Sequence, residues 1–111
     1  MNIVKSEEAG ALIVALDGRL DTNSCNTLET SLFADLDGGA KVIVVDCAKL
    51  AYISSAGLRV LLMTAKRMKG TGGKLALCAL GPNIQEVFRV SGFDKILRVV
   101  PTRSEAVAAV K

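Results

Sequence analysis

Short, nearly continuous apolar runs alternate along this chain with segments in which apolar residues recur at helical spacing. The runs are typical of strands buried on both faces, and they occupy residues 11–16, 41–46, 74–80 and 96–100. A further short strand is predicted at residues 3–6, before a turn at Glu8-Ala9-Gly10. Strands that alternate with helices indicate strand–helix–strand units. The pattern therefore predicts an α/β fold in one domain, residues 1–111, with a mixed, mostly parallel sheet of about five strands and helices mainly on one face.

Residues that favour helix ends bound the segments of helical spacing. The helices are predicted to begin at Thr22 or Asn23, at the Ser54-Ser55 pair, at Pro82 and at Thr102, and the first three to end near Gly38, Gly70 and Gly92. Asp17-Gly18 has the composition of a hairpin turn, but helical periodicity after Leu20 argues against a hairpin. The predicted core consists of Ile13, Val14, Leu16, Leu28, Leu32, Val42, Val44, Leu58, Leu61, Leu62, Leu75, Leu77, Val87 and Phe88.

The charge balance is a small excess of 14 basic over 11 acidic residues, or +3 in 111 residues. This excess is too small and too interleaved with acids to predict a nucleic-acid partner, and an aromatic share of 4% leaves no stacking platform. The densest basic cluster, Lys66, Arg67 and Lys69, falls in the last turns of the second helix, where cations complement the helix dipole. Because no apolar run approaches about 20 residues, no membrane partner is predicted either.

The chain contains no histidine, which excludes Ser-His-Asp and Cys-His catalysis and any imidazole metal site. Its three cysteines, Cys25, Cys47 and Cys78, are widely spaced and form no Cys-x-x-Cys pair. We therefore predict buried free thiols, no metal and no cofactor. The start of the chain, Met1–Lys5, has no apolar run like that of a signal peptide, so a cytoplasmic location is expected.

A pair of serines followed by two small residues stands at the predicted start of the second helix. The segment reads Ser54-Ser55-Ala56-Gly57. A helix start presents free backbone N–H groups and favours negative charge, so a serine there can cap the helix or carry a phosphoryl group. Judged on these residues alone, the capping role is the commoner one.

Two motifs in the order of elements resemble the STAS family (sulfate transporter and anti-sigma factor antagonist domains). Gly18-Arg19-Leu20-Asp21 resembles the Gly-x-Leu-Asp element after the family's second strand. The segment from Asp46 to Leu58 resembles the family's strand–loop–helix, whose signature is Asp-Ser-Ser/Thr-Gly-Leu. The resemblance covers nearly the whole chain and implies the same fold.

The resemblance also implies roles for individual residues. Aligning Gly57-Leu58 with the family's Gly-Leu places Ser55 on its phosphorylated serine and Ser54 where many members have Asp, which makes Ser54 a rival acceptor. The implied partner-binding surface comprises Asp21, Thr22, Ser54, Ser55, Ala56, Gly57 and Arg59. Asp21 either shapes this surface or caps the first helix. Asp46 is expected near the same edge, closing a turn.

The implied function is that of a bacterial anti-sigma factor antagonist, a binding module and not an enzyme. Its unmodified form would bind a serine kinase that is also an anti-sigma factor and so release a sigma factor. Phosphorylation of Ser55 would end binding, and a phosphatase would reverse it. The alternatives are a non-phosphorylated STAS scaffold or subunit of a larger complex, favoured by Ser54 in place of Asp, and a small-molecule or nucleotide-binding module. A Ser-Lys pairing of Ser55 with Lys49 is open, with nothing in its favour.

Overall fold

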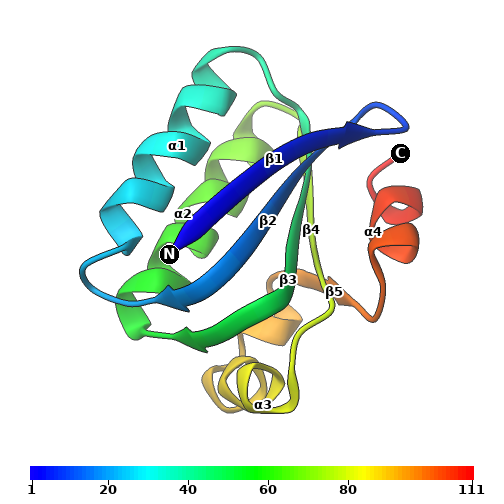
Figure 1. Ribbon diagram of the computed structural model, residues 1–111. Coiled ribbons are helices and arrows are strands. Elements are labelled where there is room, and N and C mark those ends of the chain that lie inside the picture. The colour runs from blue at the N-terminus through cyan, green and yellow to red at the C-terminus, as the bar shows by residue number, and fades with distance from the viewer.

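Five strands form a single sheet in their order along the chain in the computed structural model, which describes residues 1–111 (Figure 1). They are β1 (Asn2–Glu8), β2 (Ala11–Leu20), β3 (Val42–Ile53), β4 (Lys74–Cys78) and β5 (Arg98–Val100). Only β1 is antiparallel to its neighbour; the pairs β2–β3, β3–β4 and β4–β5 are parallel. The predicted mixed, mostly parallel sheet is confirmed.

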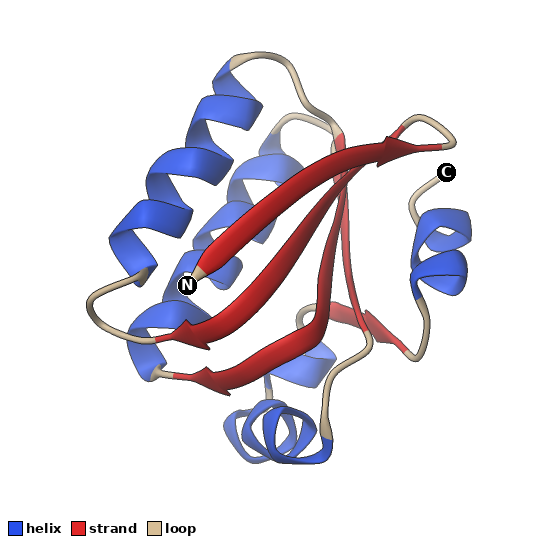
Figure 2. Ribbon diagram, viewed as in Figure 1, coloured by secondary structure: helices blue, strands red, loops and turns tan.

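Helices cover the two faces of this sheet unequally (Figure 2). The elements are α1 (Cys25–Asp37), α2 (Ser55–Gly70), α3 (Pro82–Ser91), the 3₁₀ turn η1 (Phe93–Lys95) and α4 (Arg103–Ala109). Apolar residues of α1, α2 and α3 share one core of 20 buried residues with the sheet, whereas α4 closes a smaller core of 8 on the opposite face. Helices therefore lie mainly on one face, as predicted.

Strands β2 and β3 run further than the apolar pattern indicates. The prediction ended them at residues 16 and 46, but they continue to Leu20 and Ile53. Asp17-Gly18 continues β2 rather than forming a hairpin. The register shifts at Ala15/Asp17 and at Gly18/Arg19, and at each shift the extra residue belongs to β3. Because β1 pairs only to Asp17 and β4 only to Asp46, residues 18–20 and 50–53 form a two-stranded extension, the β2–β3 ribbon.

Most of the predicted helix ends are confirmed. Pro82 is the first residue of α3, and Gly92 ends that helix with a left-handed φ of 78°. Thr102 caps α4 by accepting from the Glu105 N–H. The predicted start of the first helix at Thr22 or Asn23 is wrong: α1 begins at Cys25, because a side-chain-bonded turn occupies residues 21–24.

Ten of the predicted core residues are buried, among them Leu61, which is 0% exposed. Val42, Leu62, Leu75 and Val87 are only half-buried. Leu62 and Val87 lie toward the outer side of their helices, beside the buried Leu61 and Phe88. Helical spacing alone does not separate the centre of an apolar face from its border.

All three cysteines are unpaired and buried, as predicted. Burial raises the pKa of the Cys47 thiol above its ordinary value and raises the pKa of Cys78 to about 11. Thiolate, the reactive form, is therefore scarce at neutral pH. We expect a thiol reagent to titrate three groups in denaturant and few in the native protein. Reducing and non-reducing electrophoresis should give the same monomer band; an intramolecular disulfide would contradict the structure.

Candidate functional site

The two serines at the start of α2 have different environments. Ser54 is the N-cap, with extended φ and ψ of −90° and 170°, and its Oγ accepts a hydrogen bond from the Gly57 N–H at 3.1 Å. Its own N–H donates to the Leu20 carbonyl at 2.8 Å, which ties α2 to the end of β2. Ser55 is the first residue of α2; it is exposed, and its hydroxyl has no hydrogen-bond partner in the chain. The capping role thus belongs to Ser54, and the free hydroxyl to Ser55.

Gly57 lets the first turn of α2 lie directly on the β2–β3 ribbon. A Cβ at this position would come within 2.7 Å of Leu20 Cγ and 3.1 Å of Ile53 Cγ1. Leu20 and Ile53 are both buried beneath the helix start. Close packing is therefore the reason for glycine here, and it fixes where the neighbouring serines emerge.

Asp21 organises the turn between β2 and α1. Its carboxylate accepts from the N–H groups of Asn23 and Ser24, at 3.0 and 3.1 Å, while the Asp21 N–H donates to Ser24 Oγ at 2.9 Å. The hydrogen bond from the Ser24 N–H is the main cause that holds the Asp21 pKa below its ordinary value. Asp21 thus closes the turn before α1 and does not cap the helix: the N-cap residue is Ser24, and no side chain caps the first turn of the helix.

An aromatic–cation pair lies on the open face of the β2–β3 ribbon, which sequence reasoning missed. Arg19 and Tyr52 are register partners on β2 and β3, and the Arg19 guanidinium lies 4.3 Å from the centre of the Tyr52 ring. Tyr52 is 41% exposed and stands two residues before Ser54. Arg59, a predicted partner-binding residue, is exposed on α2, and Thr22 is exposed in the turn after β2.

Asp46 is not at the serine edge, which corrects its expected position. Because β3 continues to Ile53, Asp46 sits in the middle of the strand and is 8% exposed. One carboxylate oxygen accepts from the Ala48 N–H at 2.9 Å, within the strand and not in the predicted turn, and the other pairs with Arg103 of α4 at 2.8 Å. Lys49 lines a hollow with this ion pair on the α4 side of the sheet, so the structure does not bring it to Ser55.

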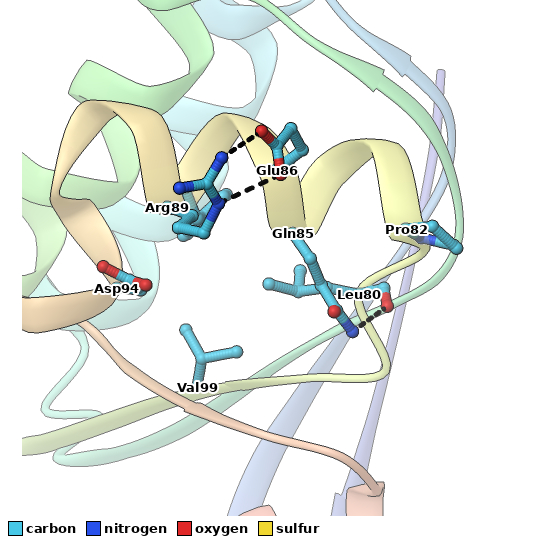
Figure 3. Close-up of a pocket in the computed structure, with 8 residues that line it drawn as sticks. Leu80, Pro82, Gln85, Glu86, Arg89, Asp94 and Val99 are labelled. Carbon is cyan, nitrogen blue, oxygen red and sulfur yellow. Dashed lines mark hydrogen bonds and ion pairs between the residues drawn. The ribbon is translucent and has the colours of Figure 1, made fainter.

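A surface hollow of about 500 Å³ lies between α3, η1 and β5 (Figure 3). Glu86 and Arg89 form an exposed ion pair at its rim, and Gln85 Nε2 donates to the Leu80 carbonyl at 2.9 Å. None of its lining residues belongs to the predicted partner-binding set. No cluster of acidic or cysteine side chains suited to a metal ion occurs, and no helix has the length and hydropathy needed to cross a membrane.

The division of roles between the serines predicts a stability difference. Ser54→Ala should lower the free energy of unfolding by about 1 kcal/mol, because it leaves the Gly57 N–H without its cap. Ser55→Ala, which removes no hydrogen bond, should change it by less than about 0.5 kcal/mol. Urea denaturation of both variants measures the difference. Equal losses would contradict the assignment of Ser54 as the cap.

Comparisons with known proteins agree with this architecture. The STAS domain family model matches residues 2–106. BtrV of Bordetella bronchiseptica, whose name assigns it as a candidate anti-sigma factor antagonist, is 41% identical over 111 residues, covering 100% of this chain and 96% of BtrV.

Solved structures of two further proteins share the fold. A candidate anti-sigma factor antagonist of Thermotoga maritima matches with a TM-score of 0.93 at 21% identity, over 97% of this chain and 93% of that one. The phosphorylated form of the Bacillus cell fate determinant SpoIIAA matches with a TM-score of 0.74 at 20% identity, over 99% and 100%. With nearly the whole chain matched by the family model, this protein belongs to the STAS domain family, among relatives named as anti-sigma factor antagonists.

Proposed function

We propose that this protein is an anti-sigma factor antagonist in a partner-switching pathway. The unmodified chain binds an anti-sigma factor that is also a serine kinase, and binding frees a sigma factor. The kinase then transfers the γ-phosphoryl group of ATP to Ser55 Oγ, which loses its proton, and ADP leaves. A phosphatase hydrolyses the phosphoserine and restores the binding form. Because the cycle consumes ATP and controls a sigma factor, we place it in the cytoplasm.

The observation that carries this proposal is the free, exposed hydroxyl of Ser55 at the first position of α2. The competing hydroxyl of Ser54 already accepts the Gly57 N–H and is half-buried. A phosphoryl group on Ser54 would break the cap, whereas one on Ser55 extends from the helix start into solvent. The geometry therefore favours Ser55 as the acceptor.

The start of α2 suits the product as well as the acceptor. The first turn of α2 carries no acidic residue, so a phosphate on Ser55 meets no carboxylate within that turn. Negative charge at a helix N-terminus is stabilised by the helix dipole, by about 0.3–1 kcal/mol at exposed sites. The fold should therefore tolerate the phosphoserine, and its effect should fall on the partner.

Ser54 in place of the family's Asp is compatible with this role. Asp and Ser are about equally good N-cap residues, and Ser54 does cap α2. The substitution keeps the start of the helix and removes one negative charge beside the acceptor. It changes the electrostatics that a kinase meets, without changing the accessibility of Ser55.

Phosphorylation of the purified chain by the anti-sigma factor kinase of its own organism tests the proposal. With ATP present, intact-mass measurement should show one added phosphoryl group, and peptide mapping should place it on Ser55. Ser55→Ala should gain none, while Ser54→Ala should still be modified at Ser55. Modification of Ser54, or of neither serine, would refute the assignment and favour a non-phosphorylated STAS scaffold.

A further inference from the structure

The outward face of α2 combines basic and apolar side chains in one line. Counted from Ser55, the residues at helical spacings of 4, 7, 8 and 11 are Arg59, Leu62, Met63 and Lys66. Arg59 and Lys66 are exposed, Met63 is 37% exposed and Leu62 is half-buried. We call these five residues the α2 outer stripe. Its opposite face, with Leu61 and Met68, is fully buried against the sheet.

The positive charge of the stripe has no counterpart within the chain. Helix α2 contains no aspartate or glutamate, and neither Arg59 nor Lys66 takes part in any ion pair. Arg67, just off the stripe, is bonded instead to Asp37 and lies over the Phe33 ring of α1. Arg67, which faces α1, is thus paired with an acidic residue, whereas Arg59 and Lys66, which face outward, are not.

Helix stability does not explain the stripe as a whole. The helix dipole acts mainly within the first and last turns, and both cations lie outside them: Arg59 is the fifth residue of α2, and the basic residues of its last turn are Arg67 and Lys69. Exposed Met63 between the two cations adds an adaptable apolar contact of the kind found on protein-binding surfaces. The two unpaired cations and the exposed Met63 side chain together indicate a protein-binding surface on α2.

We propose that the α2 outer stripe is the docking surface for the anti-sigma factor, and that this partner presents an acidic surface with an apolar pocket for Met63. This assignment rests on the proposed function. The stripe begins at Ser55, the proposed phosphorylation site, so the two surfaces are continuous. It extends the interface from Ser55 by about three helical turns, to Lys66.

An acidic partner surface also gives the switch its direction. Cations on the stripe attract that surface when Ser55 is unmodified, whereas a phosphate on Ser55 places negative charge against it. Like charges brought together in an interface oppose binding strongly. The same partner chemistry thus favours the unmodified form and rejects the phosphorylated one.

Binding of the full chain to the anti-sigma factor kinase, measured by calorimetry without ATP, tests the docking surface. Lys66→Glu should weaken binding about tenfold or more, and Met63→Gln several-fold. Wild-type affinity should fall as salt rises. The matched control is Lys111→Glu, the same charge reversal at an exposed residue after α4, on the other side of the sheet; it should bind within about twofold of wild type. Thermal unfolding verifies that each variant is folded.

The outcomes separate the two proposals. If wild type binds the kinase and both stripe variants bind equally well, the docking surface is wrong while the proposed function stands. If wild type does not bind the kinase, the proposed function fails and the docking surface with it. Salt-sensitive binding of wild type to a random-sequence DNA duplex, weakened by Lys66→Glu, would reassign the stripe to nucleic acid and overturn the inference.

Discussion

Phosphorylation of Ser55 is expected to weaken binding to the anti-sigma factor by at least about a hundredfold. A phosphoserine carries about −1.5 to −2 charges at neutral pH, and Ser55 is an exposed residue at the edge of the proposed interface. A dianion there must lose water and meet the partner's acidic groups, which opposes binding by several kcal/mol. Since each 1.4 kcal/mol is about tenfold in affinity, a loss of two orders of magnitude or more follows.

Two substitutions isolate this effect from any change in the fold. Ser55→Ala should bind as tightly as the unmodified chain and keep binding when ATP is added. Ser55→Asp should bind weakly, although one charge imitates two incompletely, and its thermal unfolding should match wild type. Calorimetry with the phosphorylated chain and both variants measures the difference. A phosphorylated chain that binds as tightly as the unmodified one would refute the switch.

Of the substitutions considered, Leu61→Ala should lower the free energy of unfolding the most. Leu61 is 0% exposed, in the middle of α2 and within the core shared with α1 and the sheet. Leu61→Ala should lower the free energy of unfolding by about 2–5 kcal/mol, because it removes buried methyl groups and leaves a cavity. Urea denaturation, with the slope compared to wild type, measures the loss.

Leu62 is the matched control, because it is the same residue type one position along the helix. It is half-buried, on the outer stripe, so Leu62→Ala should lower the free energy of unfolding by only about 1 kcal/mol. The pair therefore tests how α2 is rotated about its axis. A larger loss for Leu62→Ala than for Leu61→Ala would mean that the outer stripe faces the core, which would also remove the basis of the proposed docking surface.

Much of the fold is predictable because the central strands are buried on both faces. Residues such as Val44 and Val45 therefore form a continuous apolar run that does not depend on register. Helix ends such as Pro82, Gly92 and Thr102 follow from local backbone chemistry, which a sequence shows directly. The serine pair at the start of α2 is predictable in the same way, because the helical pattern that follows it marks where the helix begins.

The features that the sequence does not reveal depend on pairing between distant segments. The β2–β3 ribbon buries only one face, and its alternation is interrupted by register shifts, so residues 47–53 resemble a loop. The Arg19–Tyr52 contact follows from the register of that ribbon. The Asp46–Arg103 ion pair joins residues 57 apart and requires α4 to cross to the other face of the sheet. None of these has a local signature.

The β2–β3 ribbon gives this protein a region whose opening can be uncoupled from that of the rest of the sheet. Strand β3 has a neighbour on each side up to Asp46, but only β2 beside it from residue 50 to 53. Local opening there breaks one ladder rather than two, and local opening free energies within a protein range from about zero to the global value. Native-state hydrogen exchange should therefore be faster at Tyr52 than at Val44. Ser55 begins the helix whose first turn packs on this ribbon, so the support beneath the acceptor serine would open toward a kinase active site while the central strands stay closed.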